Sequence, residues 1–217
     1  MNTPLWQFWT DWAVKAVSAL ATFLAVIVAL FGSRLRHWMI PARLRIELSS
    51  TRGLKGALYE LDDTTKQARH MTDAIWFHIR VRNETRDTPV SGVHIFLLLI
   101  EAPDASGEWK PIFDGNAPLG WRHDKNPLPK TIGYQSAECD LCHVLKQPPE
   151  VRLSPINQGQ MPDLFRGAFR FVFTLQARGV EAESDKYRVG VSWDGQWSDD
   201  QGVMTDYHLV IKPAPLS

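Results

Sequence analysis

The residues with the clearest chemical potential form one short stretch, Cys139-Asp140-Leu141-Cys142-His143, which contains both cysteines of the chain. The pattern Cys-x-x-Cys-His is the attachment sequence of c-type haem, in which two thiols bond the porphyrin and the histidine ligates iron. Attachment requires an oxidising compartment, whereas the charge pattern described below favours a cytoplasmic domain. The stretch also alternates as a strand does. Because both observations argue against haem attachment, a periplasmic haem carrier is the least favoured of the three functional hypotheses given at the end of this subsection.

A zinc site is a second interpretation of the same residues. Cys139, Cys142 and His143 would supply three ligands, and His123 is a candidate for the fourth. Structural zinc sites usually have two well-spaced ligand pairs, and the second pair is missing here. The third interpretation places Leu141 and one cysteine in a core and His143 in water, since buried cysteine behaves as a small apolar residue. We favour this third interpretation and expect no cofactor.

A second candidate stretch, residues 193–200 (WDGQWSDD), is an acidic turn bracketed by two tryptophans. Its carboxylates could hold calcium, but the ligand spacing of the helix-loop-helix calcium site is absent. Asp-Gly is a strong signal for a hairpin turn, so we expect a turn rather than a metal site. The tryptophans either line a binding surface or pack across neighbouring strands.

Residues 114–138 are rich in glycine and proline, which predicts a long irregular connection. Ordered loops of this length often carry binding surfaces. We therefore predict a ligand or partner surface made of residues in or beside this loop, together with the tryptophans of the acidic turn. Its members are Trp109, Trp121, Arg122, Tyr134, Trp193 and Trp197.

Motifs of the common enzyme classes are missing from the sequence. There is no Gly-x-Ser-x-Gly elbow, no phosphate-binding glycine loop and no His-Glu-x-x-His pair. The seven histidines are scattered, and His78 and His94 fall in predicted strands, where a structural role is usual. Basic and acidic residues balance at 24 each, which argues against binding to a nucleic-acid polymer. We predict that the chain is not an enzyme.

The element that would tether all of these residues is the apolar stretch at residues 12–31, in which Lys15 is the only charge. Twenty helical residues at about 1.5 Å each span roughly 30 Å, the thickness of the hydrocarbon core of a bilayer. Tryptophan, which prefers the headgroup zone, occurs on both sides of the stretch, at Trp9 and Trp38 for example. The sequence therefore predicts one transmembrane helix at about residues 12–32, with the lipid bilayer as a partner.

The basic residues predict how this helix is oriented, because they remain on the cytoplasmic side. Five arginines follow the helix within about twenty residues, whereas only Lys15 lies near its start. We therefore expect a bacterial inner-membrane protein with a periplasmic N-terminus and a cytoplasmic C-terminal domain. A cleaved signal peptide is the alternative, but it should carry its positive charge before the apolar run, and residues 31–34 (FGSR) are a poor cleavage site.

Small residues recur every four positions along one face of the helix, at Ala21, Ala25, Ala29 and Ser33. This spacing lets two helices approach closely in lipid, so it predicts a homo-oligomer. The alternative is that alanine is simply common in membrane helices.

The rest of the chain has the pattern of a mainly β protein. Apolar and polar residues alternate in several segments, most clearly at residues 44–49, 75–81, 169–175 and 187–193, while residues 95–100 are apolar on both faces. No segment here has a convincing helical period. We expect an N-terminal anchor at residues 1–40 and an antiparallel β-sandwich of immunoglobulin-like type at residues 41–217, with a partly open β-barrel as the alternative.

This organisation resembles that of uncharacterised small bacterial single-pass membrane proteins with a C-terminal β domain. The resemblance rests on the N-terminal anchor followed by Asp140-Leu141-Cys142, Gln176-Ala177, residues 191–197 (VSWDGQW), Met204 and residues 208–211 (HLVI). It implies no catalytic residues. Some bacterial effectors of phage defence are built in a similar way, with a membrane helix and a cytoplasmic β domain that senses a nucleotide or a phage product.

Three functional hypotheses follow. The first is a membrane-anchored binding or sensor module whose cytoplasmic β-sandwich recognises a protein or small ligand and whose helices self-associate. The second is a membrane-disrupting effector of phage defence that is triggered when a ligand occupies the β domain. The third is the periplasmic c-type haem carrier.

Overall fold

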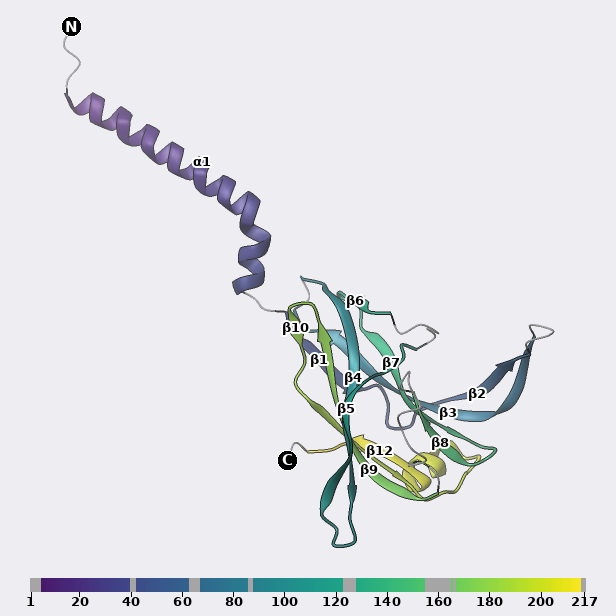
Figure 1. Ribbon diagram of the computed structural model, residues 1–217. Helices are drawn as coiled ribbons and strands as arrows, with labels where there is room; N and C mark the ends of the chain where they lie inside the picture. The colour runs from purple at the N-terminus through teal and green to yellow at the C-terminus, as the bar shows by residue number, and fades with distance from the viewer. Residues whose placement is uncertain are drawn as a thin grey trace. The chain divides into compact units, whose positions relative to one another are not determined.

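The computed structural model describes residues 5–39, 42–62, 67–85, 88–122, 128–154, 165 and 167–215. The chain divides into two compact units, Met1–Pro41 and Ala42–Ser217. The first contains a helix and the second is built mainly of strands (Figure 1). The predicted order, an N-terminal apolar helix followed by a β-rich domain, is thus confirmed.

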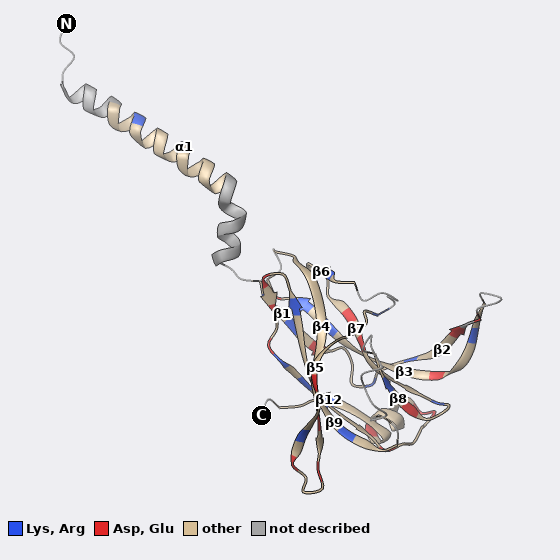
Figure 2. Cartoon of the chain, viewed as in Figure 1, with Lys and Arg blue, Asp and Glu red and all other residues tan. Residues whose placement is uncertain are grey.

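The first unit is the helix α1 (Leu5–Met39). Its segment Trp12–Ala29 is long and apolar enough to cross a bilayer, and none of that segment is buried against protein. Lys15 is the single charged side chain in the described part of the helix (Figure 2). The segment is consistent with a single membrane span or with a signal sequence, and its orientation stays a prediction.

The predicted association stripe lies on this helix. Ala21, Ala25 and Ala29 are exposed, while the side chain of Ser33 lies outside the part that the structure describes.

One antiparallel sheet of the second unit is organised around its longest strand, β3 (Ala68–Asn83). One edge of β3 pairs first with β2 (Leu54–Leu61) and then with β1 (Leu44–Leu48). The other edge pairs with β7 (Ala137–Leu145), which in turn pairs with β8 (Glu150–Leu153). The paired ends of β2 and β3 project from the rest of this unit (Figure 1).

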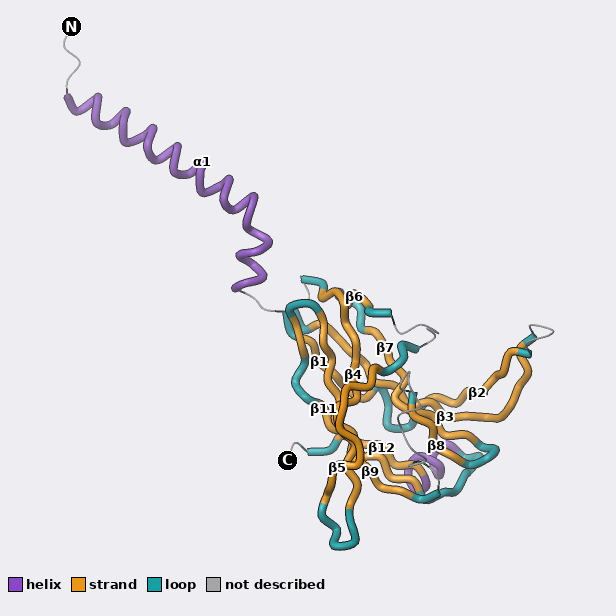
Figure 3. Tube along the Cα trace, in the orientation of Figure 1, coloured by secondary structure: helices purple, strands orange, loops and turns teal. Residues whose placement is uncertain are grey.

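The second antiparallel sheet has the strand order β12-β11-β9-β4-β5. These strands are β12 (Leu209–Pro213), β11 (Tyr187–Trp193), β9 (Phe169–Gly179), β4 (Val90–Pro103) and β5 (Trp109–Pro118). The short strand β10 (Ala182–Glu183) pairs with β9, and β6 (Lys130–Ile132) pairs with β4. Figure 3 shows how little helix accompanies these strands.

The two sheets share one hydrophobic core because alternate residues of their strands face inward. Phe77 and Ile79 on β3 are fully buried, as are Ile95 on β4, Phe173 on β9 and Val189 on β11. The prediction of a mainly β protein with two antiparallel sheets is confirmed, and one of the sheets curls into a half-barrel. An immunoglobulin-like connectivity stays a prediction.

The sequence prediction was wrong about the extent of three segments. The polar, weakly patterned residues 50–72 predict a possible hairpin followed by a loop, but residues 68–72 belong to β3. Because most of these five residues are exposed in the projecting hairpin, they lack the alternation of a half-buried strand. Residues 114–118 complete β5, and residues 130–132 form β6, within the stretch expected to be irregular. A short helical segment, α2 (Gln201–Val203) with η2 (Met204–His208), also occurs where no helix was expected.

Candidate functional site

A β-bulge on β7 determines where the Cys139–His143 side chains point. Cys139 pairs with Ile79 and Asp140 with His78, but Cys142 pairs with the next residue of β3, Phe77, so that Leu141 is an extra residue in β7. Cys139, Leu141 and Cys142 therefore all lie in the core. Asp140 and His143 occupy the outer face of the sheet.

The buried thiols do not fit either of the cofactors considered above. Cys139 Sγ donates a hydrogen bond to the carbonyl oxygen of Gly120 at 2.9 Å, and burial raises the pKa of both thiols. A metal or haem site made of this stretch needs the two thiols and the His143 ring to point to one side, whereas the thiols lie on the opposite face of β7 from His143. Among the described residues no group of three metal-ligating side chains gathers, and His123 lies outside them.

The expected position of His143 in water was wrong. The residue is 7 % exposed, and its ring stacks on Trp76 with 4.1 Å between the ring centroids. Neither of its ring nitrogens has a hydrogen-bond partner in the described structure. Burial, assisted by the charge of Arg152, lowers the pKa of His143 to about 4, so that the ring is neutral at pH 7.

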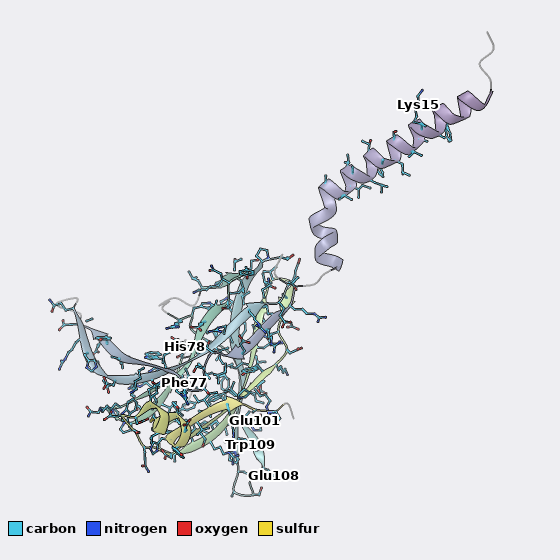
Figure 4. All side chains as sticks on the ribbon, turned by 180° about the vertical axis from the view of Figure 1, so that it is seen from behind. Lys15, Phe77, His78, Glu101, Glu108 and Trp109 are labelled. Atoms are coloured by element: carbon cyan, nitrogen blue, oxygen red, sulfur yellow. The ribbon has the colours of Figure 1, made fainter. Side chains whose placement is uncertain are left out.

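A cavity of about 630 Å³ opens on this outer face of the first sheet. It is bounded by β2, by Trp76 and His78 of β3, by Asp140 of β7 and by the adjoining Trp121 and Arg122. Figure 4 shows His78 next to Phe77 on β3, and strand alternation sends the two side chains to opposite faces. We call this cavity the first-sheet cavity.

The polar residues His78 and Asp140 meet at the first-sheet cavity. His78 is 5 % exposed, and its Nε2 atom lies 3.2 Å from Asp140 Oδ1. That distance satisfies an ion-pair criterion, but the directions of approach do not make a hydrogen bond, and Asp140 Oδ1 has no other partner in the ranges the structure describes. A buried oxygen of this kind is an acceptor available to a donor from a ligand.

Arg122 is held at the edge of the first-sheet cavity by Glu138 of β7. Glu138 also accepts hydrogen bonds from Arg80 Nη2 at 3.0 Å and from Ser49 Oγ at 2.9 Å. Burial raises the pKa of Glu138, but the hydrogen bonds from Arg80, Arg122 and Ser49 outweigh it and lower the pKa to about 2. Arg122 is therefore a positioned cation rather than a freely moving one.

The structure disperses the surface predicted from the sequence. Trp121 and Arg122 come together at the first-sheet cavity, although Trp121 is buried and donates through Nε1 to the Leu128 carbonyl oxygen at 3.0 Å. Trp109 lines a different cavity on the second sheet. Tyr134 is exposed and is not among the residues that line either cavity.

The tryptophans of the acidic turn lie in or against the core. Trp193 is 2 % exposed, and Trp197 is partly buried against the core and donates from Nε1 to Asp199 Oδ1 at 2.9 Å. The carboxylates have separate partners, since Asp194 contacts His208 at 2.8 Å and Asp199 contacts Lys146 at 2.6 Å. These contacts hold the turn together without directing its carboxylates to one point.

The sequence-based surface omitted Trp76, His78 and Asp140. A signal for the first two was present, because alternation in residues 75–81 places them on the face opposite Phe77 and Ile79. Asp140 could not be assigned to the same place, since its position depends on how the bulged β7 pairs with β3.

No protein-family model, curated protein or solved structure matches the chain. What the structure shows of the predicted organisation is an N-terminal apolar helix followed by a β-rich domain.

Proposed function

We propose that the chain is a membrane-anchored binding module. In this proposal α1 holds the protein in a bacterial inner membrane, the β domain lies in the cytoplasm, and the first-sheet cavity receives a small ligand. The observation that carries the proposal is the combination of an apolar helix segment with no buried surface and a β domain whose cavity is lined by Asp140, a carboxylate with one buried oxygen that accepts no hydrogen bond. An exposed apolar segment of this length requires a nonpolar environment.

The residues around the first-sheet cavity favour a ligand with a flat apolar part and a hydrogen-bond donor. Trp76 provides an aromatic surface, Asp140 Oδ1 provides the acceptor, and Arg122 and Lys55 provide positive charge. Small-molecule sites typically enclose about 300–1,000 Å³ and combine apolar walls with a few polar groups. The cavity of about 630 Å³ meets this description. The proposed role is recognition, without a chemical reaction.

Ligand binding can be tested on the full chain in lipid nanodiscs with a panel of metabolites that raise its Tm on binding. A compound that binds the first-sheet cavity should lose its effect when Trp76→Ala removes the aromatic surface or Asp140→Asn neutralises the acceptor. His94→Asn, on β4 of the other sheet, is the matched control and should keep the effect. Compounds that stabilise the parent and both cavity variants equally would contradict the assignment of the cavity.

The proposed orientation has its own test, in which a reporter is fused after Ser217. A reporter that works only in the cytoplasm should be active at this fusion point, and a reporter that works only in the periplasm should be inactive. The reason is that the arginines that follow the apolar segment remain on the cytoplasmic side. The opposite pattern would place the β domain in the periplasm.

A further inference from the structure

A second cavity, of about 940 Å³, lies on the outer face of the second sheet. Strand register places Glu101 of β4, Val172 of β9, Gly190 of β11 and Lys212 of β12 in one row across this face. Gly190 has no side chain, so the sheet surface is recessed at the middle of the row. The side chain of the neighbouring Val172 forms the apolar floor of this recess. We call this cavity the second-sheet channel.

The adjacent row repeats the same pattern. Ser192 of β11 lies between Arg170 of β9 and Val210 of β12, so a short side chain again occupies the centre. Trp109 of β5 forms a wall, and the guanidinium carbon of Arg170 lies 5.5 Å from its ring centroid, a cation–π contact. Figure 4 shows Trp109 near Glu101, which also lines the channel.

The charges along the second-sheet channel do not cancel. The carboxylate of Glu101 accepts from Arg188 Nη2 at 2.6 Å, and this pair is largely buried, with 17 % and 12 % of the two side chains exposed. Arg170 and Lys212 have no carboxylate partner among the residues that the structure describes. Because the whole chain has a formal net charge of zero, this excess of two positive charges is local to the channel.

We propose that the second-sheet channel binds a small anionic amphiphile, a molecule with a carboxylate, sulfonate or phosphate group attached to an apolar body. The anionic group pairs with Arg170 and Lys212, and the apolar body covers Val172, Gly190 and Val210. Charge of one sign in a low-dielectric cleft attracts a ligand of the other sign, and the apolar floor adds burial energy. This site is separate from the first-sheet cavity and does not depend on its proposed role.

The test uses the full chain in phosphatidylcholine nanodiscs and the fluorescent anionic amphiphile 8-anilinonaphthalene-1-sulfonate, with the signal of empty nanodiscs subtracted. We expect saturable binding that weakens at high salt. The double variant Arg170→Gln with Lys212→Gln should bind roughly tenfold more weakly, a loss that corresponds to about 1.4 kcal/mol. The control removes an exposed lysine elsewhere, Lys186→Gln, and should bind as the parent does.

A second variant tests the apolar floor. A Cβ atom at Gly190 would lie 3.7 Å from the nearest atom, the Lys212 carbonyl oxygen, which is ordinary contact, so β11 accepts a side chain there. Gly190→Val should fill the channel and abolish probe binding while the circular dichroism and Tm remain those of the parent. N-phenyl-1-naphthylamine, which lacks the sulfonate, should bind more weakly than the anionic probe. Parent-like binding by the charge variant, or equal binding of the neutral probe in the channel, would overturn the proposal.

Discussion

At the scale of single residues, His143 stands out because burial leaves both of its ring nitrogens without partners. Buried polar atoms are usually hydrogen-bonded, and leaving one unpaired costs about 1–3 kcal/mol. Stacking on Trp76 uses the faces of the ring but not its nitrogens. His143 therefore stabilises the fold through apolar packing, while the loss of hydration at its two nitrogens lowers the free energy of unfolding.

The lowered pKa of His143 predicts a loss of stability in acid. The unfolded chain binds a proton at this residue near pH 6.5, whereas the folded chain binds it only near pH 4. Between these values the unfolded state holds more protons, so the free energy of unfolding decreases as the pH falls from about 6.5 to about 4. The shift corresponds to about 3 kcal/mol at the acidic limit.

We predict that His143→Phe keeps the stacked ring and removes both unpartnered nitrogens. The free energy of unfolding at pH 7 should stay the same or rise by about 1 kcal/mol, and its acid-dependent decrease should shrink. Denaturant unfolding followed by circular dichroism at several pH values measures both effects. His94→Phe makes the same chemical change at a half-buried strand position and is the control for the substitution itself. A loss above about 2 kcal/mol at pH 7 would show that the ring nitrogens do have partners.

Some residue positions were predictable and others were not, for a physical reason. The alternation of residues 75–81 depends only on local strand geometry, so it correctly places Phe77 in the core and His78 on the other face. The Cys139–His143 stretch looks like a strand, but the extra residue at Leu141 turns both cysteines inward. A bulge changes which residues share a face, and it cannot be recognised from the sequence pattern of a few residues.

At the scale of elements, the end of β9 packs tightly against the beginning of β4. A Cβ atom at Gly179 would lie 2.6 Å from Val90 Cγ1 and 3.0 Å from the Ser91 carbonyl oxygen. The same Ser91 oxygen accepts a hydrogen bond from the Val180 amide at 2.8 Å, which fixes its position. Gly179 is therefore required for space rather than for an unusual backbone angle.

Gly179→Ala should destabilise the β domain by about 1–3 kcal/mol, because the added methyl group overlaps atoms that cannot move aside. Gly133→Ala makes the same chemical change where nothing lies within 4 Å of the added atom, and it should change stability by less than about 0.5 kcal/mol. Thermal unfolding of the two variants side by side measures the difference. Equal stability would mean that β4 and β9 are less closely packed than described.

The small-residue stripe of α1 gives a second prediction at this scale. Ala25→Leu should weaken cross-linking between copies of the chain in membranes, since a larger side chain keeps the helices apart. Ala19→Leu makes the same change two residues from Ala21, on the opposite side of a helix with 3.6 residues per turn, and should leave cross-linking unchanged. Equal cross-linking in the parent and both variants would remove the stripe as an association surface.

The boundaries of elements were harder to predict than their type. Strands with one buried face, such as β9 and β11, follow directly from alternation. The exposed parts of β2 and β3 are held by pairing with each other, so neither face has to be apolar. Glycine and proline in residues 114–118 indicated a loop, yet pairing with β4 retains them in a strand. Long-range pairing prevailed over local propensity in both cases.

At the scale of the whole molecule, a long apolar helix and a β-rich unit follow from composition and periodicity alone. The order of the strands cannot be derived from composition and periodicity, because β3 pairs with β7 across more than fifty residues of sequence. The first-sheet cavity depends on that pairing, and for this reason sequence reasoning found only Trp121 and Arg122 of its residues.

The proposed anchoring predicts how charges in the helix centre would act. Two aspartates, introduced as Leu24→Asp with Val28→Asp, should each disfavour insertion by about 2.5–3.5 kcal/mol and release the chain from the membrane. Both native side chains are exposed in α1, so the substitutions disturb no packing within the protein. Leu24→Ile with Val28→Leu is the matched control and should remain membrane-bound.

The most direct test of the account is alkaline carbonate extraction of membranes, followed by intact mass measurement of the recovered chain. If α1 anchors the chain, all 217 residues stay together in the membrane pellet and the double aspartate variant moves to the supernatant. A parent chain found in the supernatant, or one shortened by cleavage after its apolar helix, would contradict it.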